Sequence, residues 1–191
     1  MKHLAVFASG RGSNYEAIEN AILNNEIDDC CISLLVCDNQ DAHVIKLAEK
    51  FKRKTFVFDP KGYKNKSEYE SDIVEQLKEH KVDLICLAGY MGIIGDILLE
   101  AYPNRIINIH PSLLPSFKGS SGIKDAFEYG VKVFGITIHY VSKEIDSGEI
   151  IAQRAFEYDG DKIEEVEACI HKIEHELYPQ TIKKLIKEQG V

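Results

Sequence analysis

The sequence predicts an α/β fold, in which a mostly parallel, twisted sheet of about seven strands carries helices on both faces. Short apolar runs, rich in branched side chains, alternate with longer segments whose apolar residues recur at helical spacing. Turn-forming residues separate the two kinds of segment. Strands that alternate with helices form right-handed βαβ units, whose helices cover both faces of a parallel sheet.

Composition indicates one globular domain, residues 1–191, with 45% hydrophobic and 28% charged residues. The net charge of -8 argues against a nucleic-acid partner. We expect no membrane partner, because no apolar run reaches membrane-spanning length and the N-terminus lacks a signal-peptide pattern. The five cysteines show no Cys-x-x-Cys spacing, which favours reduced thiols in a cytoplasmic protein over disulfides or a zinc site.

The first half of the chain contains four apolar runs that we expect to be buried strands. They are Leu4–Ala8, Ile32–Cys37, Thr55–Phe58 and Val82–Ala88. Helices are expected at Tyr15–Leu23, at Ala42–Phe51 and from Ser67 onward. The last of these has Glu70 three residues after Ser67, the spacing of a capping box.

The second half begins with a short helix near Ile93–Ala101 and a strand that ends in Asn108 and His110. A loop, Ser116–Gly122, and another short helix follow. Val133–Val141 and Glu149–Phe156 are expected to pair as an antiparallel hairpin added to the parallel sheet. The final helix, Ile163–Gln189, contains Pro179, which is expected to kink or divide it.

Asn108 and His110 are the polar residues of the run Ile106–His110, and their spacing of two places both side chains on one face of a strand. An amide NH2 group can donate to a developing oxyanion, and an imidazole can exchange a proton near neutral pH. The alternative is that each side chain only satisfies nearby backbone groups. Their occurrence together, just before Pro111, favours chemistry.

Gly10–Asn14 lies between the first strand and the first helix. Its glycines allow close backbone approach, and the free N–H groups at a helix start favour a phosphate. A structural turn is the alternative. A dinucleotide site is less favoured, although Asp38 ends the second strand, because Tyr15 stands where the fingerprint needs a third glycine.

His171-Lys172-Ile173-Glu174-His175 has the His-x-x-Glu-His spacing of an inverted zinc-protease motif. Only 16 residues follow, so little chain remains for a third ligand. A solvated helix face is the favoured interpretation, and we expect no metal.

Three unusual segments lie at the ends of predicted parallel strands: Gly10–Asn14, Gly89–Gly92 and Asn108–His110. Ligands of such sheets bind at the carboxyl ends of the strands, so we expect these segments to share one edge. Asp146-Ser147-Gly148 is a turn by composition.

Asn-Ile-His-Pro-Ser-Leu-Leu-Pro at Asn108–Pro115 resembles the signature of the folate-dependent formyltransferases. The resemblance extends along the chain to the members of that family that act on glycinamide ribonucleotide in purine synthesis. Further matching stretches are Gly10–Asn14, Leu87–Met91, His139–Val141, Glu144–Gly148, Glu174-His175 and Tyr178-Pro179.

This resemblance implies the Rossmann-like formyltransferase fold and transfer of a formyl group from 10-formyltetrahydrofolate, a cosubstrate, to 5'-phosphoribosylglycinamide. It implies small-molecule partners, no metal, and a monomer or homodimer. The implied catalytic residues are Asn108, His110 and Asp146, with Asp146 as the carboxylate partner of His110. The implied nucleotide-binding residues are Gly12, Ser13, Asn14, Gly89 and Glu174. The implied folate-binding residues are Lys66, Met91, Gly92, Ile93, Ile94, Asn108, Ser142, Lys143, Glu144, Ile145 and Asp146.

The chain departs from the family pattern at a few positions. Lys66 stands where an arginine is frequent, and Gly92 replaces a frequently basic residue. The loop Ser116–Gly122 lacks the histidines that many members carry.

Three alternatives stay open from sequence. Methionyl-tRNA formyltransferase shares the central signature but adds a C-terminal tRNA-binding domain, and formyltetrahydrofolate hydrolase usually adds an N-terminal regulatory domain. From another class, a nucleotide-binding module without catalysis would use only Gly10–Asn14 and Asp38.

Overall fold

Strands and helices alternate along most of the chain, as the sequence predicts. The computed structural model describes residues 1–189. The strands are β1 (Lys2–Phe7), β2 (Cys30–Cys37), β3 (Lys54–Val57), β4 (Leu84–Leu87), β5 (Ile106–His110), β6 (Val133–Tyr140) and β7 (Ile150–Glu157). The helices are α1 (Ser13–Leu23), α2 (His43–Lys50), the 3₁₀ turn η1 (Pro60–Gly62), α3 (Lys66–Glu79), α4 (Asp96–Ala101), α5 (Gly122–Tyr129) and α6 (Ile163–Gln189).

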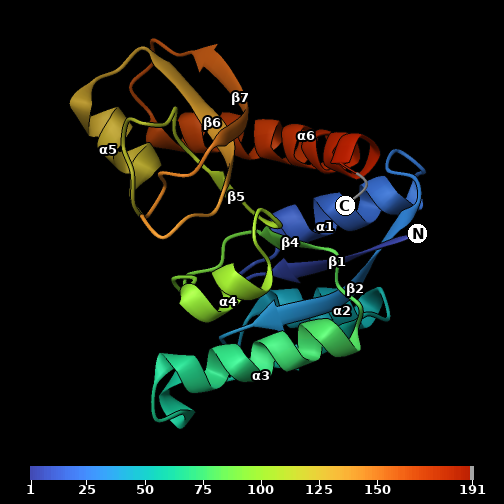
Figure 1. Ribbon diagram of the computed structural model, residues 1–191. Helices are drawn as coiled ribbons and strands as arrows, with labels where there is room; N and C mark the ends of the chain where they lie inside the picture. Colours follow the sequence, from blue (N-terminus) through green and yellow to red (C-terminus); the bar gives the residue numbers. More distant parts are fainter. Residues whose placement is uncertain (190–191) are drawn as a thin grey trace.

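The strands form one seven-stranded sheet in the order β3-β2-β1-β4-β5-β6-β7 (Figure 1). The pairs from β3 to β5 are parallel, whereas β6 runs antiparallel to both β5 and β7. The predicted fold class is therefore confirmed, including the antiparallel hairpin. The sheet changes from parallel to antiparallel at β5, the strand that carries Asn108 and His110.

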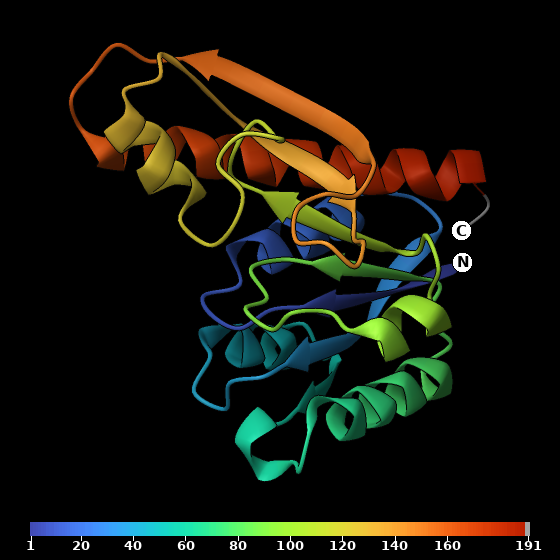
Figure 2. The ribbon, with the colours of Figure 1, turned by 60° about the vertical axis from the view of Figure 1, so that its left-hand side comes forward.

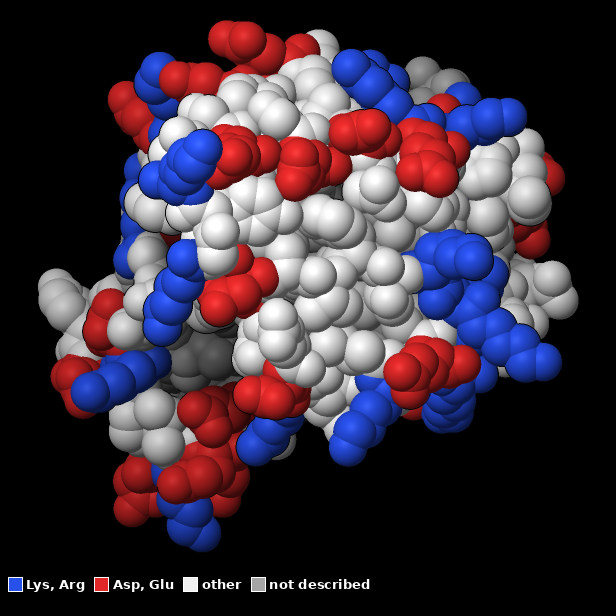
Figure 3. Space-filling model, turned by 90° about the horizontal axis from the view of Figure 1, so that it is seen from below, with Lys and Arg blue, Asp and Glu red and all other residues white. Residues whose placement is uncertain are grey.

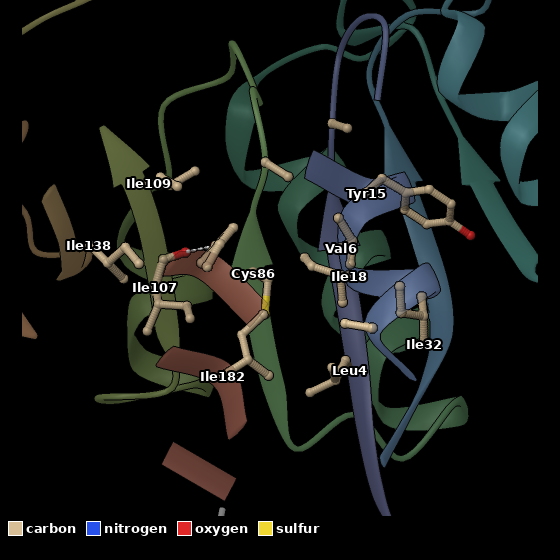
Figure 4. Close-up of a cluster of buried hydrophobic side chains, with 14 of the residues drawn as sticks. Leu4, Val6, Tyr15, Ile18, Ile32, Cys86, Ile107, Ile109, Ile138 and Ile182 are labelled. Carbon is tan, nitrogen blue, oxygen red and sulfur yellow. Dashed lines mark hydrogen bonds between the residues drawn. The ribbon is translucent and has the colours of Figure 1, made fainter. Parts of the chain in front are cut away.

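Helices cover both faces of the sheet (Figures 1 and 2). One apolar cluster joins the sheet to α1, α2, α5 and α6, and a second joins the opposite face to α3 and α4. Figure 4 shows the first cluster, in which Leu4, Val6 and Ile107 of the sheet meet Ile18 of α1 and Ile182 of α6. All five side chains are fully buried, and burial of one such side chain contributes about 1.5–3 kcal/mol to stability.

The central part of the sheet is tied to α6 by Tyr178. Its buried hydroxyl lies 2.9 Å from the carbonyl oxygen of Leu87 and 3.3 Å from that of Ile107. The hydroxyl therefore donates where β4 and β5 meet, which satisfies a polar group that would be costly to bury alone. The helix is not divided at the following residue, Pro179, so the expectation of a division is wrong. Apolar side chains on both sides of Pro179 pack into the core and hold one helix.

The start of α3 also differs from the prediction. The N-cap is Asn65, whose side chain accepts the Glu68 N–H at 3.0 Å, while Glu68 accepts the Lys64 N–H. The predicted capping box at Ser67 and Glu70 is wrong by two residues. Glu70 lies in the interior, 2% exposed, and accepts an N–H from outside its own helix.

Acidic and basic side chains alternate around a largely uncharged centre on the face seen from below in Figure 3, so this face carries no continuous basic patch. None of the helices within residues 1–189 is both long and apolar enough to cross a membrane.

A buried ion pair links α1 to the segment before β3. The guanidinium of Arg53 makes two hydrogen bonds to Glu19, at 2.6 and 2.8 Å, and the Glu19 side chain is 0% exposed. Tyr15 donates a further hydrogen bond to the same carboxylate. Nearby, Lys50 and Glu16 form a 3.2 Å pair at the surface, with side chains 62% and 39% exposed.

Loss of Arg53 is expected to be far more costly than loss of Lys50. Arg53→Leu leaves a buried carboxylate without its cation, which should lower the free energy of unfolding by about 3–5 kcal/mol. Lys50→Leu removes only an exposed pair and should cost less than about 1 kcal/mol. Urea unfolding of the two variants measures the difference. Equal costs would mean that the Glu19–Arg53 pair does not stabilise the fold as described.

Candidate active site

A cavity of about 730 Å³ opens at the carboxyl ends of β1, β4 and β5. The loops that follow these strands line it, together with the loop between β6 and β7 and one face of α6. Its size lies within the usual range for small-molecule sites. Every site residue predicted from sequence lines this cavity except Lys66, whose Nζ atom lies 3.8 Å from Glu70 Oε1. The expectation of one shared edge is confirmed.

The Asn108 side chain is oriented by His139, which faces it across the β5–β6 pair. Asn108 Nδ2 lies 3.2 Å from His139 Nε2, and His139 Nδ1 lies 2.8 Å from the Tyr140 carbonyl oxygen. A carbonyl can only accept, so Nδ1 carries the proton and Nε2 accepts from the Asn108 amide. One NH2 hydrogen of Asn108 is thereby used, and the other is available to a ligand.

The surroundings of His139 favour the neutral ring. Burial lowers its pKa, and its hydrogen bond to Tyr140 and the nearby Asp146 charge offset this only in part. Asp146 Oδ1 lies 3.6 Å from His139 Nε2, but Nε2 is the unprotonated nitrogen, so this contact is not an ion pair. His139 therefore acts on Asn108 as a hydrogen-bond acceptor.

His110 is 4% exposed and both of its ring nitrogens face acceptors. Nε2 lies 2.9 Å from the Phe117 carbonyl oxygen, and Nδ1 lies 3.5 Å from Asp146 Oδ2. A neutral imidazole carries one N–H and can satisfy only one of the two, whereas an imidazolium satisfies both. Two acceptors, the Phe117 carbonyl and the Asp146 carboxylate, therefore hold the His110 ring from its two nitrogens.

Asp146 is held in place independently of His110. Its Oδ2 atom accepts the Gly119 N–H at 2.8 Å, and its side chain is 10% exposed. Its backbone is left-handed, with φ of 49°, a conformation that Asp and Asn adopt more readily than most residues. The loops after β5 and after β6 thus meet at this carboxylate.

The Gly10–Asn14 loop presents helix N–H groups to the cavity. Gly12 precedes α1 with φ of 80°, and no side chain caps the helix start, so its first N–H groups lack partners within the helix. A Cβ atom at position 12 would lie 2.6 Å from Val44 Cγ2, so only glycine fits. Anions bind well at such a helix start.

Glu174 on α6 faces this loop. Its Oε2 atom lies 3.2 Å from Asn14 Nδ2 and 3.0 Å from His171 Nδ1. The hydrogen bond to Glu174 raises the pKa of His171, whereas burial lowers the pKa of the adjacent His175. Asn14 Oδ1 and His175 Nε2 are buried atoms without a partner in the part of the chain that the structure describes. Both residues line the cavity, although these two atoms themselves are buried.

Exposed apolar side chains also line the cavity. Met91 and Ile93, in the loop between β4 and α4, are 70% and 60% exposed, and Ile145 in the loop after β6 is 56% exposed. Exposed large apolar side chains gathered at a cavity mouth are typical of a ligand-binding wall. Tyr90 lies behind them, with its ring 5.3 Å from that of Phe7 in an edge-to-face contact.

The sequence analysis missed or misjudged several site residues. His171 is solvated, with its side chain 56% exposed, but the interpretation of a helix face without a role misses that His171 and His175 line the cavity. Among residues 1–189, however, no three potential ligands converge to hold a metal ion. The role of His139 depends on a partner on another strand, which spacing does not reveal. Asp38, the residue that kept a dinucleotide interpretation open, is absent from the lining among the described residues.

Comparisons with known proteins agree with this geometry. A family model described as "Formyl transferase" matches residues 2–182. The phosphoribosylglycinamide formyltransferase of Bacillus subtilis (strain 168) is 54% identical over 187 residues, which cover 97% of this chain and 95% of that protein. The crystal structure of phosphoribosylglycinamide formyltransferase from Bacillus halodurans matches with a TM-score of 0.94 and 43% identity, covering 98% of this chain and 97% of that one. Glycinamide ribonucleotide transformylase 1 from Geobacillus kaustophilus matches with a TM-score of 0.94 and 47% identity, covering 97% and 98%.

The histidines of the cavity should titrate in a set order. His171 should have a midpoint above the ordinary value of about 6.5, and His139 and His175 should have midpoints below it. Glu174→Gln should lower the His171 midpoint, while the exposed control Glu176→Gln should not. NMR titration of the imidazole signals measures all three.

The raised pKa of His171 also determines the direction in which the free energy of unfolding should change with pH. A group whose pKa is raised by folding stabilises the folded state fully below its unfolded pKa, and this contribution is lost as pH rises through the folded pKa. The difference in unfolding free energy between the natural protein and Glu174→Gln should therefore shrink as pH rises through the His171 midpoint. A difference independent of pH would contradict the pairing of His171 with Glu174.

Proposed function

Since the chain belongs to the formyl transferase family, we propose that it transfers the formyl group of 10-formyltetrahydrofolate to the amine of 5'-phosphoribosylglycinamide, a step of de novo purine (IMP) biosynthesis. The observation that carries this proposal is the convergence of Asn108, His110 and Asp146 in one cavity, which also offers an anion site and an apolar wall. The identity to phosphoribosylglycinamide formyltransferases over nearly the whole chain supports the same reaction.

The nucleotide would occupy the α1 end of the cavity. The uncapped start of α1 at Gly12, Ser13 and Asn14 suits a phosphate monoester. Glu174 would accept hydrogen bonds from ribose hydroxyl groups, which a carboxylate does well. Gly89, at the end of β4, lies between this end and the Asn108 side chain along the lining, and its lack of a side chain would leave room for the substrate.

The folate would occupy the apolar end. Its pterin ring offers amide and amino groups that backbone atoms can recognise, and its aromatic faces suit apolar contacts. Met91, Gly92, Ile93 and Ile94 would form one side, and Ser142, Lys143, Glu144, Ile145 and Asp146 the other. Lys66 lies outside the cavity lining, so it would contact only a part of the folate that extends beyond the cavity.

The reaction is an acyl transfer. The amine of the nucleotide attacks the formyl carbon, a C–N bond forms, and the carbonyl oxygen takes up the negative charge of a tetrahedral intermediate. The free NH2 hydrogen of Asn108 and the Nε2–H of His110 would donate to that oxygen, and loss of one such donor typically costs about 10²–10³ in rate. In the absence of ligand the Phe117 carbonyl accepts the His110 Nε2–H, so the developing oxygen would replace that carbonyl as acceptor.

Collapse of the intermediate breaks the bond between the formyl carbon and N10 of the folate. The attacking nitrogen must lose a proton and N10 must gain one, and His110 or a bound water would carry it. Asp146 would keep His110 charged and oriented, because an opposite charge a few ångströms away favours the charged ring. This scheme assigns no step to a metal. The free cysteines and the small-molecule substrates both support a cytoplasmic location.

The proposal is tested by incubating the purified protein with 10-formyltetrahydrofolate and 5'-phosphoribosylglycinamide. Mass spectrometry should find the nucleotide heavier by one formyl group, with and without a chelator in the assay. A parallel incubation with methionyl-tRNA tests the sister reaction, and one with water as the only acceptor tests hydrolysis. Formyl transfer to tRNA alone, or formate release alone, would assign the chain to the corresponding relative instead.

Asp146→Asn should abolish most of the activity while leaving the fold intact. Asparagine tolerates the left-handed backbone and can still accept the Gly119 N–H, but it removes the charge that faces His110. We expect kcat to fall by about 10²–10⁴, the span for losing acid–base assistance, with little change in nucleotide affinity. Steady-state kinetics of this variant and of the exposed control Glu149→Gln give the comparison. Wild-type kcat in Asp146→Asn would remove Asp146 from the mechanism.

A further inference from the structure

Two side chains from outside the loop Gly89–Gly95 hold its two ends. At the first end, Ser9 Oγ accepts the Met91 N–H at 2.8 Å, and the Ser9 N–H donates to the Gly89 carbonyl oxygen at 3.0 Å. At the other end, Glu70 Oε1 accepts the Gly95 N–H at 2.6 Å. Ser9 follows β1 and Glu70 lies on α3, so the loop is fixed by two separate elements.

Glu70 is an unusual residue at its position. It is 2% exposed, and its cation, Lys66, is 3.8 Å away at the surface. Burial of a carboxylate is costly unless strong hydrogen bonds compensate, and an apolar side chain would stabilise the interior more simply. The short bond to Gly95 is a charge-assisted hydrogen bond of the strong kind.

Gly95, which donates to the Glu70 carboxylate, has no side chain to displace it. A Cβ atom on Gly95 would lie 2.7 and 2.8 Å from the two carboxylate oxygens of Glu70, so any other residue at position 95 would force that carboxylate to shift. The contact therefore depends on the identity of both residues, Glu70 and Gly95. It fixes the backbone of the loop at one point, rather than filling space.

The residues between the two anchors are the ones that need support. Met91 and Ile93 are mostly exposed, so packing alone does not keep them at the cavity wall. Loop backbone held only by solvent samples many conformations, and a ligand that selects one of them binds more weakly. Both anchors lie outside the cavity lining among the described residues.

We propose that Glu70 and Ser9 are positioning residues for the folate cosubstrate: they hold the Gly89–Gly95 backbone in the conformation that receives it. This inference rests on the proposed function, because it takes that loop as the folate-binding wall. Lys66 would then act on folate binding mainly by partly neutralising Glu70. Since Ser9 immediately precedes Gly10–Asn14, its hydrogen bonds also fix the distance between the two substrate-binding loops.

Three variants and a control test the proposal in the full-length enzyme. Glu70→Ala should raise the folate KM by about 10- to 100-fold, as expected for loss of a hydrogen bond to a charged group, and Ser9→Ala by about 3- to 10-fold. Glu70→Gln keeps an oxygen acceptor and should recover much of the loss. Glu75→Gln, an exposed carboxylate on the same helix, should behave like the natural protein. In the Glu70 variants and the control the nucleotide KM and kcat should stay within about threefold, because Glu70 holds the loop at Gly95, at the opposite end from the nucleotide-binding Gly89.

Two further measurements do not depend on turnover. Hydrogen exchange at the amides of residues 91–95 should accelerate in Glu70→Ala, and calorimetric titration with tetrahydrofolate should show the same order of affinities as the folate KM values. If the natural protein transfers no formyl group, the proposed function fails, and the titration and exchange still test the anchors. If the natural protein is active but both alanine variants keep its folate KM, the inference is overturned. It is also overturned if Glu70→Ala raises the nucleotide KM and the folate KM equally, or if Glu70→Gln recovers none of the folate affinity lost in Glu70→Ala. Should Glu70→Ala not fold, Ser9→Ala and Glu70→Gln decide.

Discussion

The pairing of β5 with β6 is the constraint on which the active site depends. In this antiparallel register Asn108 lies opposite His139, and His110 lies opposite Thr137, so each pair shares one face of the sheet. The first pair orients the Asn108 amide. In the second, the Thr137 hydroxyl donates to the Ser112 carbonyl and accepts the Leu114 N–H, which fixes the chain immediately after His110. A slip of one residue would turn all these side chains to the opposite face and dismantle the site.

The same strand pair gives the two imidazoles of the cavity, His139 and His110, different surroundings. His139 favours the neutral form, because burial lowers its pKa and its Nδ1–H is bound to the Tyr140 carbonyl. His110 faces two acceptors, one of them a carboxylate. Asp146 lies within 3.6 Å of both rings, but only His110 presents a nitrogen that can donate to it. The tautomer of His139 therefore directs the Asp146 charge to His110.

The sequence was sufficient for the fold class and for most cavity residues because those signals are local. Strand and helix periods are read within a few residues, and the ends of parallel strands meet at one edge whatever the remaining topology. What sequence could not give depends on long-range contacts. Asn65 and Ser67 are both good N-caps, and the choice of Asn65 goes together with Glu70 reaching Gly95, 25 residues away. His139 likewise acquires its role from Asn108, which lies on a different strand. The position of Lys66 in the family pattern assigns it to folate binding. That position does not reveal that its ammonium lies near Glu70 and outside the cavity lining.

The groups proposed to face the oxyanion lie on the rigid sheet, whereas loops would recognise the substrates, because the developing charge must be met by precisely placed donors. The groups that would face the developing oxyanion sit on or directly beside β5, in the middle of the sheet, where Tyr178 joins the strand to α6. Precise placement is needed there, because a donor displaced by an ångström loses most of its value to a transition state. Recognition of the two substrates is left to loops, whose backbone can follow the shape of a ligand. These loops are still not free: Asp146 joins the loop after β5 to the loop after β6 through Gly119, and Ser9 joins the loop after β1 to the loop after β4. Neighbouring substrate-binding loops are therefore fixed to one another by polar side chains, while the cavity walls remain loop backbone.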